Sequence, residues 1–73
     1  MNATVNYETR ADLIRQVLAL PPHLVDVRQT RLDRIAADMA DTLHRGGMGA
    51  DAAASSALAF VAGCVERFSA EPI

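Results

Sequence analysis

The sequence has few of the features that usually stabilise very small proteins. Cys64 is its only cysteine, so an intrachain disulfide is excluded. His23 and His44 are its only histidines, so a structural zinc site would need carboxylate ligands. At 73 residues the chain lies near the lower size limit for a self-sufficient core, where a disulfide, a metal or a second subunit is usually added. We therefore expect no metal or cofactor, and we expect a homodimer.

Lysine is absent, and nine acidic residues against seven arginines give a net charge of −2. Such a chain has no general positive field that would attract nucleic acid or an anionic membrane surface. The lack of lysine beside many alanines and arginines is typical of genes rich in G and C. This composition suggests a bacterial or phage source.

A long hydrophobic segment is also missing. The longest uncharged run, residues 52–65, is shorter than the roughly 20 apolar residues that span a bilayer. Residues 1–12 lack the basic start and apolar stretch of a signal peptide, and a lone cysteine in an apolar run is typical of a reducing compartment. We expect a cytoplasmic protein without a membrane partner, folded as one helical domain over 1–73 with short polar tails at 1–7 and 70–73.

The uncharged run predicts a helix over about 51–69 that packs closely against its neighbours, with Asp51 as a candidate N-cap. At 3.6 residues per turn, one stripe of this helix carries most of the larger side chains. Its members are Ala54, Leu58, Val61, Val65 and Phe68. A second stripe consists of the small residues Ala52, Ser55, Ser56, Ala59, Ala62 and Gly63. We predict that the first stripe packs on the rest of the chain. The second is predicted to pair with an identical copy, with Ser56, Ala59 and Gly63 at the contact.

Apolar residues at helical spacing predict another helix over about 8–20. Its stripe consists of Tyr7, Ala11, Ile14, Val17 and Leu18. Thr9 is a candidate N-cap. Pro21 should end the helix, because it disfavours helical geometry at the preceding residue and lacks a backbone donor.

A third apolar stripe predicts a helix that ends near Arg45, before a glycine-rich loop. Its members are Leu32, Ile35, Ala36, Met39, Ala40 and Leu43. The start of this helix is ambiguous: Thr30 reads as an N-cap, but residues 23–29 could be helix or a short alternating strand. We favour helix from 23, because a lone strand would have no partner in the chain. The fold class is therefore all-α, with three helices.

No group of residues predicts an enzyme. Cys64 lies inside the apolar helix, where a thiol usually packs as a small hydrophobe, and His44 is placed to cap a helix C-terminus. Ser55 and Ser56 lack the strand-turn-helix elbow of a nucleophilic serine. The glycine loop lacks both the preceding strand and the following lysine of a phosphate-binding loop.

Three arginines near the start of the second predicted helix, Arg28, Arg31 and Arg34, are the candidate partner-binding residues. Cations at this end of a helix are disfavoured by the helix dipole, so their presence needs a reason. They either pair with neighbouring aspartates or recognise acidic groups on a partner protein. The neighbouring acids are Asp26, Asp33 and Asp38.

These observations favour a non-enzymatic protein–protein interaction module, a regulatory inhibitor or adaptor that binds another protein and itself. The alternative is a dimeric helix-turn-helix DNA-binding regulator, since a helix, a glycine-containing turn and a helix follow in the right order. The last helix, however, would place alanines and serines where base edges need arginine, lysine, asparagine or glutamine.

Overall fold

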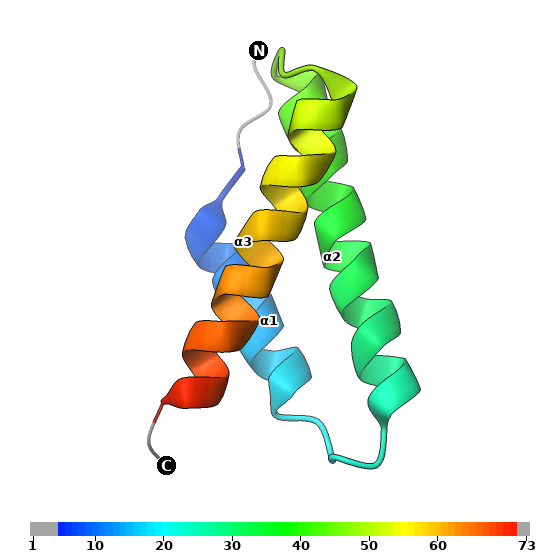
Figure 1. Ribbon diagram of the computed structural model, residues 1–73, viewed down its shortest axis with the longest axis vertical. Helices are drawn as coiled ribbons and strands as arrows, with labels where there is room; N and C mark the ends of the chain where they lie inside the picture. Colours follow the sequence, from blue (N-terminus) through cyan, green and yellow to red (C-terminus); the bar gives the residue numbers. More distant parts are fainter. Residues whose placement is uncertain (1–4, 72–73) are drawn as a thin grey trace.

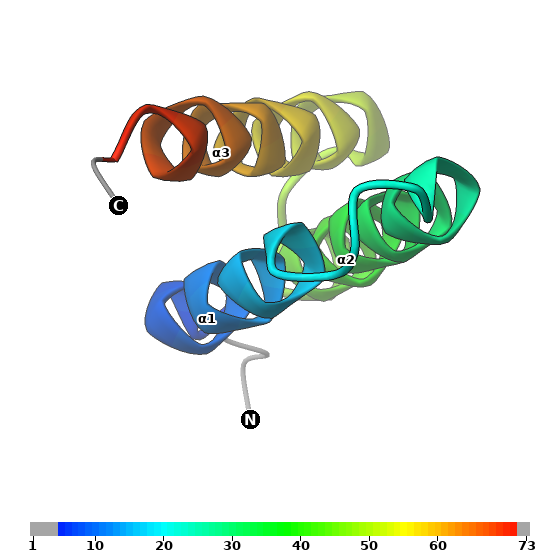
Figure 2. The same cartoon turned by 90° about the horizontal axis from the view of Figure 1, so that it is seen from below.

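The computed structural model describes residues 5–71 as three α-helices joined by short connections. Helix α1 spans Tyr7–Leu18, α2 spans Val25–Arg45 and α3 spans Ala50–Ala70. Helices α2 and α3 run in opposite directions; they are close together at the turn that joins them and further apart at their other ends (Figure 1). Helix α3 lies along one side of the pair formed by α1 and α2 (Figure 2). The all-α, three-helix prediction is confirmed.

Helix α1 begins earlier than the sequence suggested. Its N-cap is Asn6, whose side-chain oxygen accepts a hydrogen bond from the backbone N–H of Thr9 at 3.0 Å. The prediction of Thr9 as the cap was wrong, because Asn6 already satisfies that amide and Thr9 lies inside the first turn. The helix ends at Leu18, two residues short of the predicted end and before Pro21.

Helix α2 begins at Val25, so the preference for helix over strand in this segment is confirmed from that residue onward. Its N-cap is Leu24, which makes no side-chain capping bond. The cap predicted at Thr30 was therefore wrong: Thr30 lies in the second turn of a helix that is already formed. Acidic Asp26 in the first turn suits the positive end of the helix dipole.

The connection between α2 and α3 is a glycine turn. Gly47 has φ of 114°, which a side chain rarely tolerates, and its N–H donates to the carbonyl of His44 at 3.1 Å. The N–H of Met48 donates to the carbonyl of Leu43 at 3.1 Å, which completes a Schellman C-cap. Gly49 is the N-cap of α3, so the cap predicted at Asp51 was wrong.

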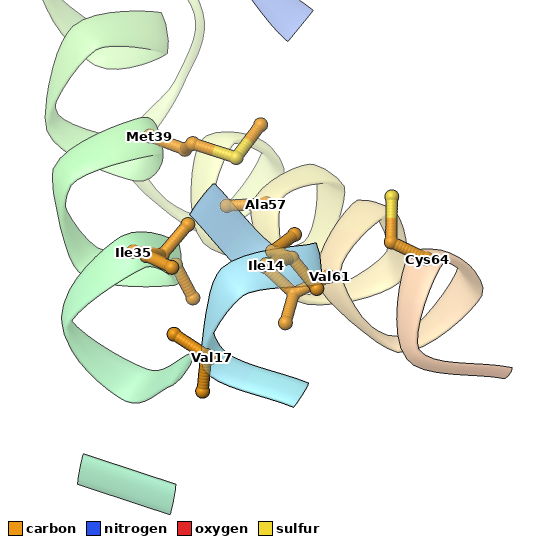
Figure 3. Packing of buried hydrophobic residues seen from close by; sticks show 8 residues of the cluster. Ile14, Val17, Ile35, Met39, Ala57, Val61 and Cys64 are labelled. Atoms are coloured by element: carbon orange, nitrogen blue, oxygen red, sulfur yellow. The ribbon is translucent and has the colours of Figure 1, made fainter. Parts of the chain in front are cut away.

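The core is apolar and thin. Ile14 and Met39 are its largest fully buried side chains, and they lie between the helices with Val17, Ile35 and neighbouring residues (Figure 3). The predicted stripes of α1 and α2 supply buried residues as expected: Ile14 and Val17, and Ile35, Ala36 and Met39. Among residues 5–71, no polar or charged residue is buried.

The stripe predicted for α3 is partly wrong. Its buried residues are Ala53, Ala57, Val61 and Cys64. Of the predicted larger-residue stripe, Val61 is buried and Val65 and Phe68 are half-buried against the core, whereas Ala54 is exposed and Leu58 is 60% exposed. Alanine at two buried positions lets the backbone of α3 approach its neighbours closely, so small residues serve the core of the single chain as well as the outer surface.

Contacts at two places join α1 to α3 outside the core. The rings of Tyr7 and Phe60 lie 5.2 Å apart between centroids in a tilted arrangement. Arg15 places its guanidinium 4.1 Å from the centroid of Phe68 and forms an ion pair with Glu71, with Nη1 and Oε2 2.9 Å apart. Both side chains of this pair are half exposed, so the pair contributes about 1 kcal/mol at most.

Candidate partner-binding groove

An open groove of about 800 Å³ runs between α1 and α2. No residue of α3 lines it, so it lies on the face of the α1–α2 pair that α3 does not cover (Figure 2). Its apolar residues are Leu13, Val17, Leu20, Val27 and Ile35. Its charged residues are Arg10, Asp26, Arg31, Arg34 and Asp38. The groove therefore combines an apolar floor with charged walls.

The structure brings Arg31 and Arg34 together in this groove and adds Arg10 from α1. All three lie outside the two ion pairs found among residues 5–71, which join Arg15 to Glu71 and Arg45 to Asp41. The alternative explanation for this cluster was that the arginines pair with neighbouring aspartates. In the described part of the chain, no ion pair supports it. Arg31 and Arg34 are exposed, whereas Arg10 is half-buried.

Arg28 does not join them. Its guanidinium turns towards the end of α1, where Nη2 donates to the carbonyl oxygen of Leu18 at 2.9 Å. That carbonyl is among the last of α1 and has no partner within the helix, so Arg28 caps the C-terminus, where a positive charge is favourable. Its Nε is buried without a hydrogen-bond partner among the described residues. Arg28 therefore joins α1 to α2 rather than facing outward.

A second, smaller groove of about 370 Å³ lies between α2 and α3. Its apolar residues are Leu32, Ala36, Leu58, Val61, Ala62 and Val65. Its charged residues are Asp33 and Glu66, and no arginine lines it. The two grooves flanking α2 thus differ in the sign of the charge on their walls.

The outward face of α3 carries the predicted self-association residues. Ser56, Ala59 and Gly63 are all exposed, and their spacing of three and four residues places them on one side of the helix. A Cβ atom added to Gly63 would meet nothing within 4 Å. In the single chain, this surface is therefore open and has room for larger side chains.

The candidate catalytic residues are spread over the molecule. Cys64 is buried in the core, about 20 Å along α3 from the start of that helix. His44 lies at the opposite end of the bundle, where its Nδ1 is 2.9 Å from the carbonyl oxygen of Met48. His23 is exposed in the connection before α2, and Ser55 and Ser56 are exposed on α3.

The described residues contain no group of three or more histidine, cysteine, aspartate or glutamate residues that could hold a metal ion. Within residues 5–71, no helix combines the length and the apolar character that crossing a membrane requires.

Sequence reasoning missed Arg10 as a member of the groove. A signal for it exists, because Arg10, Leu13, Val17 and Leu20 recur every three or four residues and share one side of the chain. These residues lie beside the stripe of α1 that packs on α3. Only the position of α2 in the structure shows that they line a groove.

Comparison of the chain with protein-family models, with curated proteins and with solved structures finds no match.

Proposed function

We propose that this chain is a small non-enzymatic interaction module that binds another protein through the groove between α1 and α2. The observation that carries the proposal is the presence of three arginines on the walls of an apolar groove, outside the ion pairs of residues 5–71. Arginine is enriched at interface hot spots, where its planar fork binds carboxylates with two parallel hydrogen bonds. An apolar floor adds the hydrophobic contact that such an interface needs.

The test removes the charges of Arg31 and Arg34 by changing both to alanine. A matched control, Arg45→Ala/Arg67→Ala, removes the same charge from exposed sites outside the groove. Each protein is used as bait in the native host, and bound proteins are identified by mass spectrometry. We expect the groove variant to lose its specific partner while the control keeps it, at equal thermal stability. Equal partner recovery by both variants would contradict the proposal.

Binding of DNA is the alternative, and the clustering of three arginines is the observation in its favour. Two observations weigh against it. Asp26 and Asp38 share the groove with the arginines, and the first turns of α3 present Asp51, Ala52 and Ser55 to solvent. A DNA complex that dissociates steeply with salt and depends on Arg31 and Arg34 would favour this alternative.

We further propose that two copies associate through the outward face of α3. Its support is the uncharged run from Ala52 to Val65, in which Ser56, Ala59 and Gly63 are exposed on one side of the helix. A surface of small side chains allows two helix backbones to approach closely. In water, burial of the apolar side chains between them would supply the driving force.

Gly63→Leu is a clean test of this association, since the single chain has room for the new side chain. Replacing an exposed helix glycine should stabilise the monomer by roughly 0.5–1 kcal/mol. We expect the variant to be monomeric by light scattering and at least as stable as the original chain when both are monomeric. A variant with unchanged mass at all concentrations would contradict the proposed interface.

A further inference from the structure

We propose that the groove between α1 and α2 receives an amphipathic helix of about three turns, with carboxylates beside its apolar stripe. This inference rests on the proposed function and names the kind of partner that the groove fits. Three properties of the groove carry it: the length of its walls, the position that it leaves open in the bundle and the charges along it.

The length of the groove matches a short helix. Its lining residues extend from Arg10 to Val17 on α1, with Leu20 in the connection beyond that helix, and from Asp26 to Asp38 on α2. At 1.5 Å per residue, the two helical walls measure about 11 and 18 Å. A helix of about 12 residues, or about three turns, has the length of the longer wall.

The groove also lies where a fourth helix could pack against α1 and α2. Three helices pack around one core. Val17 and Ile35 belong to that core and also line the groove. Leu13 and Val27 lie beside them with 36% and 38% of their surfaces exposed. A guest helix would cover these side chains and complete a four-helix arrangement. An extended peptide would usually add to a sheet edge, and residues 5–71 contain no strand.

The charges on the walls select an acidic guest. Three arginines against two aspartates leave the groove positive, although the chain as a whole has a net charge of −2. Arg31 and Arg34 lie about one turn apart on α2, so carboxylates three or four residues apart on a guest helix could meet both. The groove between α2 and α3 carries Asp33 and Glu66 and would repel such a guest. The charge therefore distinguishes two grooves that are both apolar at the base.

A display library of randomised peptides about 15 residues long, built on a helix-forming background, provides the test. We expect the enriched peptides to carry apolar residues at positions i, i+3 or i+4 and i+7, with aspartate or glutamate beside them. Their affinity should fall at least tenfold for Arg31→Ala/Arg34→Ala and for Leu13→Ser, and should be unchanged for Arg45→Ala/Arg67→Ala. Circular dichroism of each variant verifies that the helices are intact.

The failures of the two proposals are distinguishable. Enriched peptides that depend on the arginines but lack the helical spacing would overturn the amphipathic helix and leave the interaction module standing. Peptides with basic residues beside the stripe, or peptides indifferent to the groove variants, would also overturn the inference. A pool of random-sequence DNA duplexes that binds with the same arginine dependence, while no peptide does, would overturn both.

Discussion

Ala57→Leu is the variant that tests most directly how α3 packs. Ala57 has no exposed surface and belongs to the core cluster with Ile14, Met39 and Val61. Leucine adds three carbon atoms at a point where α3 approaches its neighbours closely. Overpacking a well-packed core in this way costs about 1–3 kcal/mol, because neighbouring side chains and helices must shift.

This cost is large for such a small chain. Domains of 73 residues have free energies of unfolding of about 4–11 kcal/mol. With a urea slope near 1 kcal/mol/M, the midpoint of unfolding should fall by about 1–3 M. The melting temperature should fall by roughly 5–20 °C.

Ala59→Leu is the matched control. Ala59 lies two residues further along α3 and is exposed, so the same substitution should leave the stability of the monomer within about 0.5 kcal/mol. Both variants are compared with the original chain by urea unfolding at two protein concentrations, because association makes stability depend on concentration. Equal midpoints for Ala57→Leu and Ala59→Leu in monomeric samples would refute the assignment of the Ala57 stripe to the core.

Three further predictions concern single positions, all measured by urea or thermal unfolding. Asn6→Ala should lose about 1 kcal/mol with the N-cap, whereas Thr9→Ala should lose little; the reverse order would restore Thr9 as the cap. Gly47→Ala should cost about 1 kcal/mol or more because of its positive φ, although the added Cβ would meet no atom within 4 Å; unchanged stability would contradict the strain expected from this φ. Ile14→Ala should lose about 2–5 kcal/mol, since it removes one of the two largest fully buried side chains; a smaller loss would mean that the core collapses around the gap.

The stripes of α1 and α2 could be predicted because large apolar residues repeat there at helical spacing. The residues at which the helices start were harder to predict. Thr9, Thr30 and Asp51 have the chemistry of N-caps but lie inside helices, whereas Leu24 and Gly49 stand at N-cap positions without a side-chain capping bond. Packing against the rest of the chain therefore decides these two starts more than local capping does.

The buried side of α3 could not be read from the sequence for a different reason. Eight of the eleven positions from Ala52 to Ala62 are alanine or serine, so several faces of the helix have similar hydrophobicity. The sequence therefore did not show that Ala53 and Ala57, rather than Ala54 and Leu58, share the buried side with Val61. The side that is buried depends on how closely α3 approaches α1 and α2, which is a property of the assembled bundle. The groove could not be predicted from the sequence either, because Arg10 and Arg31 come from different helices and only the fold brings them together.

The two proposed surfaces can be occupied at the same time. The groove lies on the side of α1 and α2 that α3 does not cover, while Ala59 and Gly63 lie on the outward side of α3. In a dimer formed through α3, each copy would then carry its groove away from the two-fold axis. Such a dimer would bind two partner helices, one in each groove. A partner that is itself dimeric would therefore bind more tightly, because after its first helix has bound, its second helix is held close to the second groove. Gly63→Leu should remove this gain while leaving the affinity for a single acidic helix unchanged. A measured complex of two chains with one helix would mean that the surfaces overlap.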